Sequence, residues 1–233
     1  MTENNYIVIL VHPENPRNIG FCSRAMKCNN VKELRIVSDR WTEMHSGAYI
    51  TGTSSKPILD SAKFYTSLDT ALGDCHSSVA FSRRRYAEAD DFCFLPTLSE
   101  KLFLEDKIAL VFGRESQGLF EEEMEMCTHL CEIPIIDQMS YNLGQACAIA
   151  LYELCQKGLA HRQISGGNRP TQTEKKAFNK LLLELLDKDY LRKGKKLTKF
   201  SKFLNRINPN QSELRLIFGL FRKIAAKPVR KSQ

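Results

Sequence analysis

The alternation of short apolar runs with helical patterns constrains the fold of this chain more than any other feature. In residues 1–156, two stretches with helical spacing alternate with five apolar runs of strand length. These runs are residues 6–11, 33–38, 78–82, 107–113 and 131–136. The helical stretches are residues 20–30 and 142–156, and we expect the acidic run at residues 120–126 to lie on a solvated helix face. Parallel strands need crossover connections, which are usually helices, so this alternation predicts an α/β domain with a mostly parallel sheet.

The charge of the chain divides it near residue 160. Residues 1–156 carry 14 Lys and Arg against 22 Asp and Glu, a net charge of −8, whereas residues 157–233 carry 20 against 5, a net charge of +15. This asymmetry favours a polyanionic partner, with nucleic acid ahead of an anionic membrane because the basic part lacks an obvious lipid-inserting face.

The basic part begins after a stretch rich in Gly, Pro, Ser and Thr, which predicts a linker. Beyond it, amphipathic segments at residues 174–191, 196–207 and 212–226 predict a small helical bundle, the third opened by Ser212 as a cap. We therefore expect a first domain over residues 1–159, a linker over 160–173 and a basic helical domain over 174–233.

Two classes of protein are disfavoured. No apolar segment approaches the roughly 18 residues of a membrane span, and no basic segment precedes the short apolar run at the start, so we expect a cytoplasmic location. The eight cysteines form no CxxC pair, and Cys127, His129 and Cys131 have no evident fourth ligand. We expect these residues to pack in the interior, and we expect no bound metal.

Three loops that follow predicted strands carry the unusual residues. Open parallel sheets bind ligands at the carboxyl ends of their strands. Neither GxGxxG nor GxxxxGK[ST] occurs, so a standard dinucleotide or P-loop site is not expected. The loops instead combine glycines, Gly113 and Gly118 among them, with polar side chains. These polar residues are Asn18, Arg24, Glu115, Ser140 and Asn142. This composition suits a small polar ligand held largely by main-chain groups.

The segments "NPRNIGFCSRAM", "VFGRESQGL" and "IPIIDQMSYNLGQACAIALYE", in this order and spacing, resemble the motifs of the SPOUT superfamily of RNA methyltransferases, in its TrmH/TrmJ group. The resemblance covers about residues 5–156, and the basic tail is similar to that of the TrmJ branch. It implies a parallel sheet with a C-terminal trefoil knot, S-adenosylmethionine (SAM) as cofactor, and a homodimer. It also implies 2′-O-ribose methylation of RNA, with the tRNA anticodon loop as the expected position. Alternatives are an rRNA or other tRNA position, or a non-catalytic RNA-binding assembly factor.

The resemblance also implies roles for single residues. The residues expected to contact SAM are Phe81, Ser82, Arg83, Gly113, Gly118, Ile133, Met139, Ser140, Tyr141 and Leu143. Those expected around the reaction are Arg24, Asn18, Glu115, Ser140 and Asn142. Those expected to contact RNA are Arg17, Arg83, Arg84, Arg85, Lys195, Lys196, Lys199 and Lys202. The segment "AFSRRRY" departs from the small, Thr/Ser-rich turn usual in the group.

Some of these roles have alternatives. Arg24 either accepts the ribose proton or holds a substrate phosphate and stabilises the alkoxide, and physical grounds favour the second role, since an arginine pKa exceeds 12. It could also simply pair with an acidic neighbour. Asn142 could act only as a helix cap, and Ser140 has a similar ambiguity. Glu115 could be purely structural, organising its loop or the helix ends beside it.

Overall fold

The computed structural model describes residues 5–84, 92–102, 106–136, 139–160, 170–185 and 211–225. The chain divides into two compact units, residues 1–165 and 166–233. Within the described residues, no helix is long and apolar enough to cross a bilayer.

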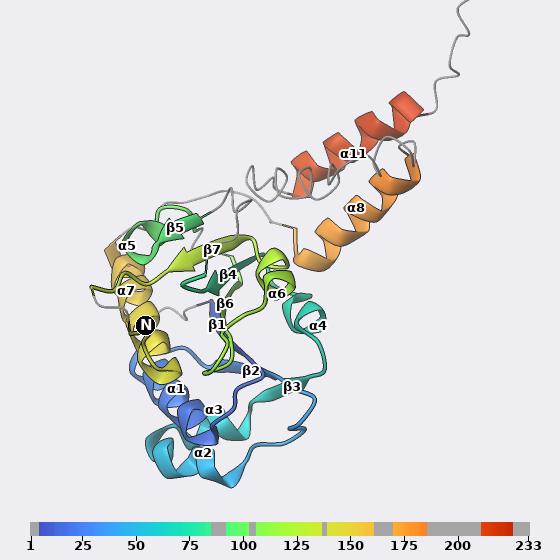
Figure 1. Ribbon diagram of the computed structural model, residues 1–233. Coiled ribbons are helices and arrows are strands. Elements are labelled where there is room, and N and C mark those ends of the chain that lie inside the picture. The colour runs from blue at the N-terminus through green and yellow to red at the C-terminus, as the bar shows by residue number, and fades with distance from the viewer. Residues whose placement is uncertain are drawn as a thin grey trace, which may run out of the picture. The chain divides into compact units, whose positions relative to one another are not determined.

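The first unit is built on a seven-stranded sheet with strand order β3-β2-β1-β6-β4-β7-β5 (Figure 1). Every described pairing between its strands is parallel. Phe112 at the end of β6 is in register with Leu10 of β1 and with Phe81 of β4. The carboxyl ends of the central strands therefore lie along one edge. The strands are β1 (Tyr6–Val11), β2 (Glu33–Val37), β3 (Lys63–Tyr65), β4 (Ser77–Phe81), β5 (Phe92–Phe94), β6 (Ile108–Phe112) and β7 (His129–Glu132).

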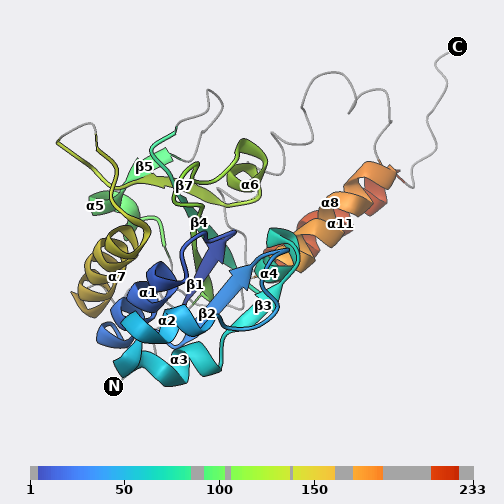
Figure 2. The same cartoon turned by 60° about the horizontal axis from the view of Figure 1, so that its bottom comes forward.

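Helices cover both faces of this sheet, and the strands alternate accordingly. Side chains of β1 such as Val8 and Leu10 share a core with α1, α2, α3, α5 and α7, whereas Ile7 and Ile9 face a second core with α4 and α6 (Figures 1 and 2). Strands buried on both faces read as continuous apolar runs, which is why their pattern was visible in the sequence. The helices are α1 (Pro16–Cys28), α2 (Ser46–Thr51), the 3-10 helix η1 (Thr53–Ser55), α3 (Lys56–Asp60), α4 (Leu68–Leu72), α5 (Leu95–Leu98), α6 (Glu121–Glu125) and α7 (Leu143–Ala160).

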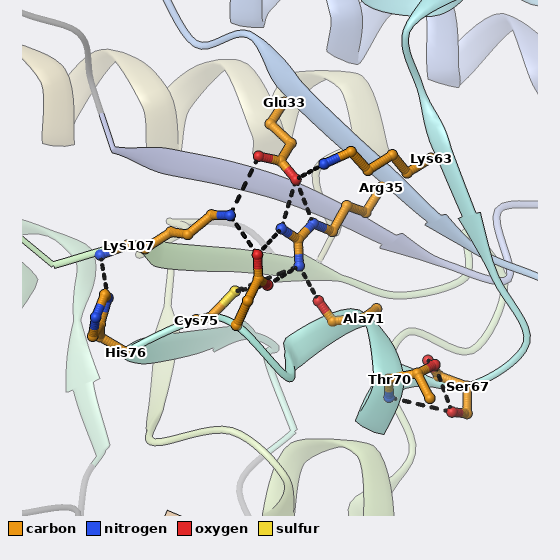
Figure 3. A network of polar contacts seen from close by, with 10 residues as sticks. Glu33, Arg35, Lys63, Ser67, Thr70, Ala71, Cys75, His76 and Lys107 are labelled. Carbon is orange, nitrogen blue, oxygen red and sulfur yellow. Dashed lines mark hydrogen bonds and ion pairs between the residues drawn. The ribbon is translucent and has the colours of Figure 1, made fainter. Parts of the chain in front are cut away.

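A cluster of charges lies around Arg35 of β2 (Figure 3). The Arg35 side chain is only 1% exposed, and its guanidinium donates to both Glu33, at 2.5 and 2.9 Å, and Asp74, at 2.6 and 3.0 Å. Lys63 adds an ion pair to Glu33 and Lys107 one to Asp74. A buried guanidinium needs such compensation, because an unpaired buried charge is strongly destabilising. This cluster joins β2, β3 and the segments before β4 and β6.

Several sequence predictions change in detail. The predicted strand at residues 131–136 is instead β7 at His129–Glu132, because Pro134 lacks the N–H that a continued ladder would require. The first helix begins at Pro16 rather than at residue 20, with Asn15 as its cap. The structure also contains elements that the sequence analysis did not predict, namely the short strands β3 and β5 and the helices α2 to α5. The helix expected in the acidic run at residues 120–126 is present as α6.

In the second unit, the structure describes two helices, α8 (Gln172–Leu185) and α11 (Gln211–Ala225). They contact each other, and the Phe178 and Phe218 rings lie 5.7 Å apart between centroids. The helix expected at residues 196–207 lies outside the described residues. Since α11 begins at Gln211, Ser212 lies within its first turn rather than at the expected cap position.

Candidate active site

A pocket of about 690 Å³ opens at the carboxyl ends of β4, β6 and β7. This volume is typical of small-molecule and cofactor sites. Three loops supply most of its wall, and α1 contributes Asn18. The lining residues are Asn18, Phe81, Ser82, Arg83, Arg84, Phe112, Gly113, Arg114, Glu115, Ser116, Gln117, Gly118, Ile133, Ile135, Ser140, Tyr141, Asn142, Leu143 and Ala146.

The loop after β6 closes on itself as a tight turn. Arg114 and Gly118 exchange two backbone hydrogen bonds, N–H to O, at 3.1 and 2.9 Å. Gly118 has a φ of +67°, which an ordinary side chain disfavours, and a Cβ on Gly113 would lie 2.2 Å from the carbonyl carbon of Gly118. The turn therefore leaves no room for a side chain at Gly113 and disfavours one at Gly118, and it presents Glu115 at its tip.

Glu115 is the acceptor that ties this turn to the start of α1. Its carboxylate accepts from the backbone N–H groups of Glu14, at 2.7 Å, and Asn15, at 3.1 Å, and from Asn18 Nδ2, at 2.9 Å. In return, Glu14 accepts from the N–H and the hydroxyl of Ser116. A carboxylate at a helix N-terminus is favourably placed, because unpaired N–H groups point toward it. The expectation that Glu115 organises the loop and the helix end is consistent with this geometry.

Asn142 extends the same network to the third loop. Its Nδ2 donates to Asn18 Oδ1 at 2.9 Å, and its Oδ1 accepts from the N–H of Gln145 at 3.1 Å. Gln145 Oε1 accepts in turn from the N–H of Asn142, which gives a reciprocal cap at the start of α7. Asn142 is therefore both a helix cap and a pocket residue.

The wall of the pocket is aromatic and aliphatic on one side. The rings of Phe81 and Phe112 stack with their centroids 4.7 Å apart and their planes nearly parallel, at 4°. Ile133, Ile135 and Leu143 add aliphatic surface. Apolar walls with a few fixed polar groups and nearby main chain suit a nucleoside-like ligand, so these residues fit SAM.

Most residues predicted to contact the cofactor line this pocket. The exception is Met139, whose side chain is 76% exposed and does not line it. Arg24 also does not line the pocket; it lies on the exposed side of α1. The predicted RNA contacts Arg83 and Arg84 are exposed at the rim. Arg17 is exposed on α1. The remaining predicted RNA contacts, Arg85, Lys195, Lys196, Lys199 and Lys202, lie outside the described residues.

The sequence did not single out several residues of the site. Ser116 and Glu14 form the reciprocal half of the clamp made by Glu115. Arg114 braces the turn, since its guanidinium makes a two-pronged pair with Glu123 at 2.9 and 3.0 Å and lies 4.0 Å from the Phe120 ring centroid. Glu123 had been expected only on a solvated helix face. Among the described residues, no group of three or more His, Cys, Asp or Glu side chains could hold a metal.

A parallel sheet whose strand ends converge on one such pocket is the usual arrangement of an α/β domain that binds a small ligand at its carboxyl edge. The chain belongs to the SpoU rRNA Methylase family, whose model matches residues 5–152. It is therefore a SAM-dependent RNA methyltransferase acting on a ribose 2′-hydroxyl.

Two relatives and one solved structure illustrate the similarity. The chain is 33% identical over 206 residues to the tRNA (cytidine-2′-O-)-methyltransferase TrmJ of Methanocaldococcus jannaschii, covering 86% of this chain and 87% of that protein. It is 32% identical over 190 residues to the tRNA (cytidine/uridine/adenosine-2′-O-)-methyltransferase TrmJ of Pseudomonas aeruginosa, covering 79% and 72%. The crystal structure of TrmJ from Z. mobilis has the same fold, with a TM-score of 0.77 at 21% identity over 94% of this chain and 98% of that one.

Proposed function

We propose that this enzyme methylates the 2′-hydroxyl of a nucleotide in the anticodon loop of tRNA. The observation that carries the catalytic part of the proposal is the hydrogen-bonded series Glu115–Asn18–Asn142, which ties the loops after β6 and β7 to the start of α1 around one pocket. The two TrmJ relatives described above act on tRNA at a ribose 2′-oxygen, which supports tRNA as the substrate.

SAM would occupy the pocket, where its nucleoside would contact the wall of Phe81, Ile133 and Leu143 and the main chain at Gly113. When bound, it supplies an electrophilic methyl group. The protein's task is then to place a ribose hydroxyl in line with that group, and positioning of this kind can remove much of a reaction barrier. We also propose that the loops around the pocket form the trefoil knot that the SPOUT resemblance implies.

Arg24 lies nearly two turns along α1 from Asn18, which is roughly 9 Å along the helix axis. Its side chain is exposed, and a guanidinium in that position is available to an RNA phosphate. Because arginine keeps its proton at neutral pH, we assign it to holding the substrate phosphate and stabilising the developing alkoxide rather than to accepting the proton.

The first test is transfer of labelled methyl from SAM to total tRNA and, separately, to rRNA, followed by nuclease digestion to locate the modified nucleotide. Label in the tRNA anticodon loop supports the proposal. Label in rRNA keeps the chemistry and refutes the tRNA substrate. SAM binding without label in either RNA favours a non-catalytic role.

Substitution of Arg24 tests whether this residue takes part in the reaction. Arg24→Ala should abolish methyl transfer while SAM binding, measured by calorimetry, stays unchanged. Arg24→Lys keeps the positive charge but loses the forked geometry, and should retain partial activity if electrostatics dominate. An unchanged rate in Arg24→Ala would remove this residue from the mechanism.

We further propose a homodimer formed through α1 and α7. These helices pack together, and their outward faces expose Phe21 (45%) and Tyr152 (63%). Exposed aromatic residues on adjoining helices are typical of interfaces. Phe21→Glu should yield a monomer in sedimentation velocity, and a wild-type protein that sediments as a monomer would refute the dimer.

The basic second unit is proposed to bind tRNA, with residues 1–159, 160–173 and 174–233 as catalytic domain, linker and RNA-binding extension. Binding through phosphates weakens steeply with salt. Replacing Lys195, Lys196, Lys199 and Lys202 by Ala should make the fall of the tRNA association constant with salt less steep. The slope of log K against log salt should decrease in magnitude by roughly 0.7 to 0.9 for each phosphate that the protein no longer neutralises. An unchanged slope would favour a role of this unit in dimerisation.

A further inference from the structure

An aromatic and basic group of three residues, Arg40, Trp41 and His45, follows β2 at the same edge of the sheet as the pocket. The Arg40 guanidinium carbon lies 5.7 Å from the centroid of the Trp41 ring. The Trp41 and His45 ring centroids are 6.1 Å apart, with their planes tilted by 39°. Trp41 is partly buried against the core, whereas Arg40 and His45 are exposed.

The backbone of this group is fixed rather than loose. Ser38 Oγ accepts from the N–H groups of both Arg40, at 3.0 Å, and Trp41, at 3.1 Å. His45 caps α2, because its Nδ1 accepts from the N–H of Gly47 at 3.0 Å. The ring of His45 is thereby held in one orientation beside the indole. The backbone of Arg40 and Trp41 and the ring of His45 are thus preorganised, and we call the three residues the platform.

This platform adjoins the loop that leads to the active site. After β1, His12 takes a left-handed conformation with a φ of 47°, and its Nδ1 lies 3.2 Å from Asp39, next to Arg40. Two residues further on, Glu14 holds the pocket turn through Ser116. None of Arg40, Trp41 and His45 lines the pocket. The platform is therefore a surface next to the catalytic site that the cofactor leaves free.

The charges around the platform indicate what it recognises. Asp39 and Glu43 outnumber the single cation Arg40 between residues 38 and 46, so this stretch is not a track for phosphates. An aromatic face with an arginine beside it is instead suited to an unpaired nucleobase, which stacks on indole, imidazole or guanidinium planes.

We propose that Trp41, flanked by Arg40 and His45, stacks an unpaired base of the substrate RNA outside the cofactor pocket. This inference rests on the proposed function, since it assumes an RNA loop at the active site. It identifies the substrate as single-stranded at a second position besides the methylated nucleotide. In this arrangement Arg40 moves from the ring face toward the RNA as the base takes its place.

The chain offers a direct probe, because Trp41 is its only tryptophan. The experiment measures the fluorescence of Trp41 in the full-length protein, corrected for absorption by the RNA. The protein is titrated with tRNA, with a short single-stranded RNA, with duplex RNA and with inorganic tripolyphosphate. We expect strong quenching by tRNA and single-stranded RNA, weaker quenching by duplex, and none by tripolyphosphate. Absent quenching by an RNA that filter binding shows to be bound would overturn the proposal, and so would equal quenching by tripolyphosphate.

Variants provide a second measurement. Trp41→Ala should weaken binding of the single-stranded RNA about tenfold or more, as expected for loss of one stacked base, while Trp41→Phe keeps a ring and should lose only a few-fold. Phe94→Ala, which removes an exposed aromatic residue from the edge strand β5, is the matched control and should bind as the wild type does. Wild-type RNA affinity in both Trp41 variants would refute the platform.

The proposed function and the proposed stacking surface at Trp41 can be refuted independently. Methyl transfer to tRNA without quenching of Trp41 would refute the platform and leave the proposed function standing. Quenching by single-stranded RNA without methylation of tRNA would refute the proposed substrate and retain the stacking surface.

Discussion

Gly113 allows a sharp test of how the pocket is built. A Cβ at this position would lie 2.2 Å from the carbonyl carbon of Gly118, 2.4 Å from its oxygen and 2.4 Å from the nitrogen of Leu119. All three are backbone atoms, so no side-chain rotation relieves the clash. Gly113→Ala must therefore open the turn that carries Glu115.

The size of the effect follows from the interactions that hold the turn closed. Overpacking of a tight site costs about 1–3 kcal/mol. Parting Arg114 from Gly118 removes two backbone hydrogen bonds, worth about 0.5–1.5 kcal/mol each. We expect Gly113→Ala to lower the free energy of unfolding by roughly 3 kcal/mol and to weaken SAM binding more than tenfold.

Gly118 is the matched control within the same turn. A Cβ there meets nothing within 4 Å, and only its φ of +67° opposes a side chain, at about 1–2 kcal/mol. Gly118→Ala should keep most of the SAM affinity, and Gly118→Asn should be milder because asparagine tolerates this conformation. Urea denaturation measures the free energy of unfolding of each variant, and calorimetric titration measures its SAM affinity. A Gly113→Ala protein with wild-type stability and SAM affinity would refute the reasoning.

Four further predictions concern other parts of the first unit. Glu115→Ala leaves two backbone N–H groups at the start of α1 without their acceptor, so SAM affinity should fall several-fold; unchanged affinity would contradict the clamp. Asn142→Ala removes the cap of α7 and should cost about 1 kcal/mol in urea denaturation, whereas no loss would show that Gln145 caps alone. The Arg35 guanidinium holds the pKa of the Asp74 carboxyl below its usual range. The stability that this ion pair contributes is therefore present above the ordinary carboxyl pKa and is lost as the pH falls toward the lowered pKa of the folded state. Asp74→Asn should be less stable than the wild type at pH 7 and should lose less stability below about pH 4. Brief alkylation at pH 7.5 followed by mass spectrometry should modify one cysteine per chain, Cys28, the only exposed one of the eight, and rapid labelling of a second would refute this.

The strands that the sequence predicted well are those in the middle of the sheet. Residues 6–11 and 107–113 form continuous apolar runs because β1 and β6 are buried on both faces. The strands β3 and β5 are three residues long and lie at the two edges, so they leave too little periodicity to be recognised. Edge strands depend on tertiary pairing more than on their own composition.

The site was predictable in its loops but not in its contacts. The glycines and polar residues after the strands indicated where Asn18, Glu115 and Asn142 would meet, since parallel strands end at one edge. The pairing of Glu14 with Ser116 joins residues 102 positions apart in a register that composition does not encode. The sequence likewise did not reveal that Trp41 and His45 lie side by side.

The hydrogen bond from Asn142 to Asn18 spans 124 positions of the chain, and this separation has a consequence for biogenesis. A nascent chain that ends before Asn142 lacks the third loop of the pocket, so the SAM site is incomplete. At a synthesis rate of roughly 5–20 residues per second, about 6–25 s separate the emergence of the two asparagines. During that interval the cofactor cannot assist folding. Once α7 has docked, the binding energy of SAM stabilises the first unit as a whole. The supply of SAM should therefore affect the lifetime of the finished enzyme rather than the yield of early folding steps.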